Sequence, residues 1–176
     1  MIIKTCDITL KDKEKYINFG ECRSLLPKSI GEPGERTFSI EIECQNNYVN
    51  LLLEKEQLAL IAQNIHKYKT FSEPNKMLPS ITDKSIIKNF KLMDFALEFD
   101  ESSNIFDFYF VGIDEQDKGI AAMFFYKNEY AQSFAITCLK IISKGRPICS
   151  LCLNPINKDG HFCIKMNGHI ENIKIA

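Results

Sequence analysis

Apolar and polar residues alternate along several segments of the chain, as half-buried strands require. In residues 37–44 four apolar side chains share one face and three polar ones share the other, which we expect to face water: Phe38, Ile40, Ile42 and Cys44 against Ser39, Glu41 and Glu43. Residues 45–47 predict a turn, and residues 48–53 the return strand of a hairpin. Residues 92–99, 105–113 and 120–126 predict three further strands.

The first thirty residues give a weaker pattern. A strand is predicted near residues 2–10, where apolar residues recur. The charged stretch that follows, up to Ser29, is expected to be irregular because Pro27 discourages regular structure.

Two segments carry apolar residues at helical spacing. Residues 58–68 form one such stripe, and residues 128–144 form the second. Asn128 is a suitable N-cap for the second helix, and Lys144 followed by Gly145 is a typical helix end. Residues 70–83 contain two prolines and predict a loop.

The order of these elements predicts an α+β fold. We expect residues 1–145 to form a body of mainly antiparallel strands with two helices packed on one face, and residues 146–176 to form a small C-terminal knob. The order strand–strand–helix followed by strands and a second helix is that of a ββα duplication, although the two halves share little residue identity.

Composition narrows the class of protein. The chain has 176 residues, of which 45% are hydrophobic, and a formal net charge of −1, which excludes wholesale disorder. From Cys138 to the end there are six basic and two acidic residues, a charge of +4, so the remainder carries −5. The basic end could contact an anionic partner, or its charges could simply be solvated. The chain has no strongly basic domain, so a large surface for binding a nucleic-acid duplex is not expected.

We expect a cytoplasmic protein. Lys4 and Asp7 interrupt the apolar N-terminus before a signal peptide could form, and no apolar run is long enough to cross a membrane. Disulfides are therefore not expected to persist, and Cys44 and Cys138, which lie in apolar periodic segments, are predicted to be buried thiols.

The C-terminal cysteines carry the clearest chemistry. Cys149 and Cys152 form a Cys-x2-Cys pair, and His161 and Cys163 follow after a turn-forming segment. Three thiolates and one imidazole at this spacing predict a tetrahedral structural zinc site with no open position for catalysis. A redox dithiol or unligated thiols are the alternatives, and His169 could replace His161 as a ligand. Because residues 146–169 contain few large apolar side chains, bound zinc would supply the stability that a small core cannot.

A second candidate is the turn at residues 31–36. A Pro-Gly pair typical of a type II turn is surrounded by Glu32, Glu35 and Arg36. These charged residues could hold a ligand or form an acid–base pair, or the turn could be only an exposed connection between elements. No Gly-x-Ser-x-Gly, phosphate-binding Gly-x4-Gly-Lys or His-Glu-x-x-His motif is present in the chain.

Three segments together resemble one family. They are residues 31–38 (Gly-Glu-Pro-Gly-Glu-Arg-Thr-Phe), residues 53–58, and the ending that runs from Gly145-Arg146-Pro147 through Cys149 and Cys152 to His161-x-Cys163 and Asn167-Gly168. This combination is similar to a bacterial family catalogued as domain of unknown function 3090, over residues 30–169. The resemblance implies a cytosolic protein with a metal-binding C-terminus, and it implies no activity. In two places the chain departs from that family: its lysine-rich start is longer, and His169 stands where an aromatic residue is common.

From these observations we expect a non-enzymatic binding or adaptor module that contacts a protein or nucleic acid through its basic C-terminal segment. The alternative is an enzyme acting on a small phosphorylated or nucleotide substrate. It would use the loop from Glu32 to Arg36 together with Arg146, Asn167 and His169, provided that these residues converge.

Overall fold

The computed structural model describes residues 2–4, 15–45, 47–68 and 88–145, and the single positions 149, 156, 160 and 161; for residues 2–4 it describes the backbone alone. Within these ranges the elements are β1 (Ile2–Lys4), β2 (Ile17–Ile30), β3 (Thr37–Cys44), β4 (Asn47–Leu53), α1 (Lys55–His66), β5 (Lys88–Asp100), β6 (Ile105–Ile113), β7 (Gly119–Lys127) and α2 (Asn128–Ser143). The protein is therefore of the mixed α+β class, as the residue pattern predicts.

The strands from β2 to β7 close into a ring. The hydrogen-bonded order is β5-β4-β3-β2-β7-β6, and β6 pairs back with β5, so these six strands form a barrel. The pairs β4–β5 and β2–β7 are parallel and the others are antiparallel. Strand β1 adds outside the ring, antiparallel to β5. A barrel of six strands is narrow enough for side chains to fill its interior.

The ring is built from two topologically equivalent halves. Strands β2-β3-β4 followed by α1 repeat the order of β5-β6-β7 followed by α2. The two parallel contacts, β4 with β5 and β7 with β2, join the last strand of one half to the first strand of the other. Each first strand also shifts register against its hairpin partner at one place, between Cys22 and Ser24 and between Leu92 and Asp94. The halves therefore share a bulge as well as an element order.

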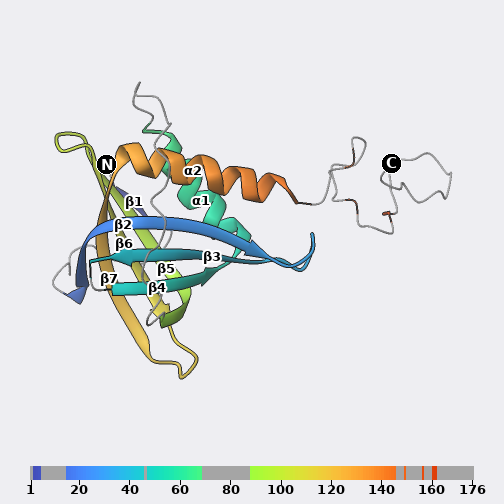
Figure 1. Cartoon of the computed structure of the whole chain (residues 1–176), viewed down its shortest axis with the longest axis horizontal. Helices are drawn as coiled ribbons and strands as arrows, with labels where there is room; N and C mark the ends of the chain where they lie inside the picture. The colour runs from blue at the N-terminus through green and yellow to red at the C-terminus, as the bar shows by residue number, and fades with distance from the viewer. Residues whose placement is uncertain are drawn as a thin grey trace.

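Both helices lie on the same side of the strands and run antiparallel to each other (Figure 1). The amide of Gln132 near the start of α2 donates to the carbonyl oxygens of Ile65 and Tyr68 at the end of α1, at 2.9 and 3.3 Å. Helix α1 begins with a capping box, in which the backbone N–H of Glu54 donates to Gln57 at 2.9 Å. The contacts of Gln132 fix the helices relative to each other, because a buried amide left without partners would be costly.

The helices and the barrel share one apolar core. Leu58, Ala62 and Ile65 of α1 and Phe134, Ala135 and Cys138 of α2 belong to the same buried cluster as the inward-facing strand residues. Phenylalanines supply much of this cluster; for example, the rings of Phe108 and Phe124 stack at 4.8 Å. The burial of Cys44 and Cys138 agrees with the pattern-based prediction.

Three local predictions are wrong. The stretch expected to be irregular forms most of β2, a strand of 14 residues. It tolerates Pro27 because β7 pairs with β2 only as far as Glu21, so Pro27 lies beside an edge where a missing N–H costs little. Asn128 is the first residue of α2 instead of its N-cap, since its side chain binds Tyr68 and Asn104. Ser39, which was expected to face water, is buried, with 7% of its surface exposed.

Two expectations concern regions that the structure describes only in part. Residues 146–176, predicted to form a knob, lie almost entirely outside the described residues, and the domain boundary stays a prediction. Neither of the described helices is long and apolar enough to cross a membrane.

Candidate functional site

A groove separates the end of β2 from the end of α2. Its volume is about 350 Å³, and it is lined by Pro27, Lys28, Ser29, Ile30, Gly31, Arg36, Ile141 and Lys144. Among the residues that the structure describes, the lining includes three basic side chains and no acidic one. Ile30 is 73% exposed at its rim, although it is large and apolar. The described chain leaves α2 beside this groove, at Gly145.

Arg36 connects the two walls of the groove. Its guanidinium donates to the backbone carbonyl oxygen of Ile141 at 3.2 Å, and it donates a second hydrogen bond to the carbonyl oxygen of Lys144. The last carbonyls of a helix lack intrahelical partners, and a cation is favoured there. Arg36 therefore caps α2 with two of its donor groups. The phosphate-binding role considered for Arg36 stays a prediction.

The turn before Arg36 has the geometry that its sequence predicts. Gly31 and Gly34 adopt φ values of 103° and 111°, and a Cβ on Gly31 would lie 2.8 Å from the carbonyl oxygen of Glu35. The N–H of Glu35 donates to the carbonyl oxygen of Glu32 at 2.9 Å. Glu32 and Glu35 are exposed and do not line the groove.

Of the five residues proposed for ligand or partner binding, the structure places two. Glu32 and Arg36 share the turn, whereas Arg146, Asn167 and His169 lie outside the described residues. Whether the two loops converge, as the enzyme hypothesis requires, stays a prediction.

The zinc ligands are also divided. Cys149 is buried, with 2% of its surface exposed, and His161 is half-buried, with its Nδ1 atom shielded from solvent. Cys152 and Cys163 lie outside the described residues. No group of three or more potential ligands occurs within the described part of the chain, which holds only half of the proposed set. A shielded thiol and imidazole are donors that suit zinc.

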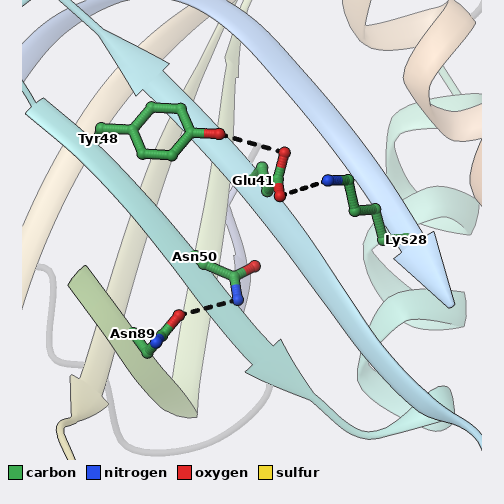
Figure 2. Close-up of polar contacts among 5 residues, drawn as sticks. All are labelled: Lys28, Glu41, Tyr48, Asn50 and Asn89. Atoms are coloured by element: carbon green, nitrogen blue, oxygen red, sulfur yellow. Dashed lines mark hydrogen bonds and ion pairs between the residues drawn. The ribbon is translucent and has the colours of Figure 1, made fainter. Parts of the chain in front are cut away.

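A polar row on the outside of the barrel was not predicted (Figure 2). The hydroxyl of Tyr48 on β4 donates to Glu41 Oε2 on β3 at 3.2 Å, and the other carboxylate oxygen of Glu41 pairs with the ammonium of Lys28 on β2. Burial and then the charge of Glu41 raise the pKa of Tyr48 to about 12. Alternation places Glu41 on the outer face, but only the register of three strands shows which residues it meets.

Sequence reasoning also missed an opening at the far end of the barrel. A hollow of about 450 Å³ is lined by Ile17, Lys88, Asn89, Phe90, Asp114, Glu115, Gln116, Lys118, Gly119 and Ile120. The hollow has both acidic and basic side chains. The carboxylate of Asp114 accepts hydrogen bonds from the backbone N–H groups of Gln116 and Lys118, at 2.9 and 2.8 Å. Its apolar lining comes from separate strands, so no local sequence pattern could identify it.

Comparison with known proteins gives a single family. The family model described as "Protein of unknown function (DUF3090)" matches residues 17–163. The chain belongs to the DUF3090 family. The match covers both halves of the barrel, both helices and all four proposed zinc ligands of this DUF3090 protein. A search of curated proteins gave no match.

Proposed function

We propose that this DUF3090 protein is a non-enzymatic binding module. Its basic C-terminal segment, held by a structural zinc ion, contacts an acidic segment of a partner protein beside the groove between β2 and α2. The observation that supports this proposal is the lining of the groove, whose described residues include Lys28, Arg36 and Lys144 and no acidic residue. Lys28 also pairs with Glu41, which lies outside this lining. Surfaces of one sign attract ligands of the opposite sign.

The apolar part of the lining favours a protein partner. Pro27, Ile30 and Ile141 border the cations, so an occupant with acidic and aliphatic side chains would match both parts. No aromatic ring is found among the described lining residues, whereas proteins that bind single-stranded nucleic acid use aromatic rings to stack bases.

The same lining argues against catalysis. In the part that the structure describes, the lining contains no imidazole, thiol or carboxylate, the groups that most often act as general acid or base near neutral pH. Two donor groups of Arg36 are engaged by carbonyl oxygens, which leaves fewer to bind a transferring phosphate. A binding role therefore fits the described lining residues better than a catalytic role does.

The test is a titration with two labelled probes, a (Glu-Glu-Leu)4 peptide and a single-stranded oligouridylate of similar charge. We expect the peptide to bind and to weaken as salt rises, because exposed charges are screened. Lys144→Glu should weaken peptide binding about fivefold or more, whereas Lys118→Glu, an equal charge change at the far end of the barrel, should not. Equal weakening by both variants, or preference for the oligouridylate, would refute the acidic-protein proposal.

A further inference from the structure

Two cysteines face each other inside the barrel. Cys22 of β2 and Cys44 of β3 are directly opposed in the antiparallel pairing of these strands, and both are free thiols. Cys22 is 4% exposed and Cys44 is fully buried. The thiol of Cys22 donates to the carbonyl oxygen of Ser24 at 3.1 Å, which holds its side chain in a defined position.

Their separation suits a disulfide bond. Opposed residues of an antiparallel pair have Cα atoms about 4.5 or 5.5 Å apart. Disulfides form between Cα atoms that are roughly 4.4–6.8 Å apart. Burial, and then a hydrogen bond with the neighbouring Cys44 side chain, raise the pKa of Cys22. The two side chains are therefore neighbours across the β2–β3 pair.

The second half of the barrel shows what this position needs for packing alone. Leu92 of β5 and Gly112 of β6 are opposed at the equivalent place, one residue before the shared bulge. A large aliphatic side chain and a glycine fill the site there, so the fold itself does not demand sulfur. The pairing of two thiols at Cys22 and Cys44 is a property of the first half only.

We infer that Cys22 and Cys44 are a modification site, a dithiol that a small organic disulfide oxidises to a cross-strand disulfide joining β2 to β3. The thiolate of Cys22, the more exposed of the two, attacks one sulfur of the oxidant and releases its other half as a thiolate. The thiolate of Cys44 then attacks the Cys22 sulfur of the mixed disulfide and releases the second half. The two protons lost by the cysteines end on the two released thiols, and the two electrons reduce the oxidant's S–S bond.

The position of the pair gives the oxidant a route. Cys44 is the last residue of β3, and the following Gln45 is exposed with a φ of 37°. Gly20, which precedes Cys22 by two residues, has a φ of 76° and lies against the side chain of Gln45. Strand ends beside turns open more readily than the centre of a sheet. Opening of this end exposes both thiols without unfolding the barrel.

The experiment treats the native full-length protein with 2-hydroxyethyl disulfide, blocks remaining thiols with N-ethylmaleimide, and digests it with trypsin without reduction. Cys22 and Cys44 fall in different tryptic peptides, residues 16–23 and 37–55, and each peptide contains one cysteine. We expect a linked pair of these peptides that is two hydrogens lighter than their sum. The melting temperature should rise by about 5 °C or more, because the link restricts the unfolded chain, and dithiothreitol should reverse the rise.

The control is the double variant Cys22→Leu with Cys44→Gly, which copies the Leu92 and Gly112 pair and keeps every other cysteine. Its melting temperature should not respond to the oxidant. An equal response in this variant would assign the effect to other cysteines and overturn the inference. A linked peptide that forms only in urea, or a stable mixed disulfide in place of the link, would overturn it as well. None of these outcomes depends on a binding partner.

Discussion

The guanidinium of Arg36 lies 3.2 Å from the backbone carbonyl oxygen of Ile141, across 105 positions of sequence. This contact ties the turn between β2 and β3 to the last turn of α2. Because the chain continues from α2 into the cysteine-containing segment, the same contact fixes where that segment starts. Arg36 thus holds the start of the proposed binding segment in place, and its charge adds to the basic lining of the groove.

Arg36→Ala should lower the free energy of unfolding by about 1–2 kcal/mol, because two helix-end carbonyls lose a charged donor. Urea denaturation followed by circular dichroism measures the change. Arg23→Ala, at the exposed bulge of β2, is the matched control and should change stability by less than about 0.5 kcal/mol. Similar losses in the two variants would show that the contact with α2 contributes nothing.

Local patterns predict the elements of this fold better than their connections. The alternation in β3 and the apolar stripes of both helices are sufficient to predict those elements, since each depends on neighbouring residues. The sequence does not predict strand β2, because charged residues and Pro27 disfavour a strand in general. They are tolerated here because β7 pairs with β2 only as far as Glu21, and only the tertiary structure creates this partly unpaired edge. Closure of the ring depends on the parallel contacts β4–β5 and β2–β7, which no hairpin signal specifies.

The same limit applies to the candidate site. The sequence singled out Arg36, but its partners are carbonyl oxygens, which carry no sequence signal. The groove combines residues 27–36 with Ile141 and Lys144, and the opposition of Cys22 to Cys44 depends on strand register. By contrast, the cysteines and histidine of the proposed zinc site are close in sequence, so spacing alone suggests them.

Gly112 is expected to be intolerant of any side chain. A Cβ at this position would lie 3.1 Å from Phe90 Cβ and 3.2 Å from the carbonyl oxygen of Lys91. Gly112→Ala should destabilise the protein by about 1–3 kcal/mol through overpacking. Gly119→Ala is the control, because a Cβ there meets only one atom, at 4.0 Å, and its midpoint in thermal or urea unfolding should stay near that of the parent. If the two variants are equally stable, the close β5–β6 packing does not constrain residue 112.

The Tyr48–Glu41 contact predicts an alkaline loss of stability. The pKa of Tyr48 is about 12 in the folded protein, against the ordinary tyrosine value of 10.0 that applies to the unfolded chain. Between these two pH values the unfolded chain has released a proton that the folded chain retains. Stability therefore falls as pH rises through this window. Tyr48→Phe should flatten that part of the stability profile, measured by urea unfolding from pH 9 to pH 12.

Glu41→Gln tests the part of this pKa shift that the charge of Glu41 adds to the effect of burial. Removing the carboxylate charge should lower the pKa of Tyr48, seen as an earlier rise in tyrosinate absorbance. Glu43→Gln should lower it less, because Glu43 makes the smaller contribution. An equal effect of the two variants would contradict the direct contact shown in Figure 2.

Zinc content tests the C-terminal prediction. Elemental analysis of purified protein should find one zinc per chain, because three thiolates and an imidazole complete a tetrahedral shell. Cys152→Ser and Cys163→Ser should each reduce that content strongly, whereas Cys6→Ser, outside the set, should not. His161→Ala and His169→Ala separate the two candidate imidazoles, and the variant that loses zinc identifies the ligand. Metal-free protein with all seven cysteines intact would refute the site and, with it, the proposed role of zinc in ordering the basic segment.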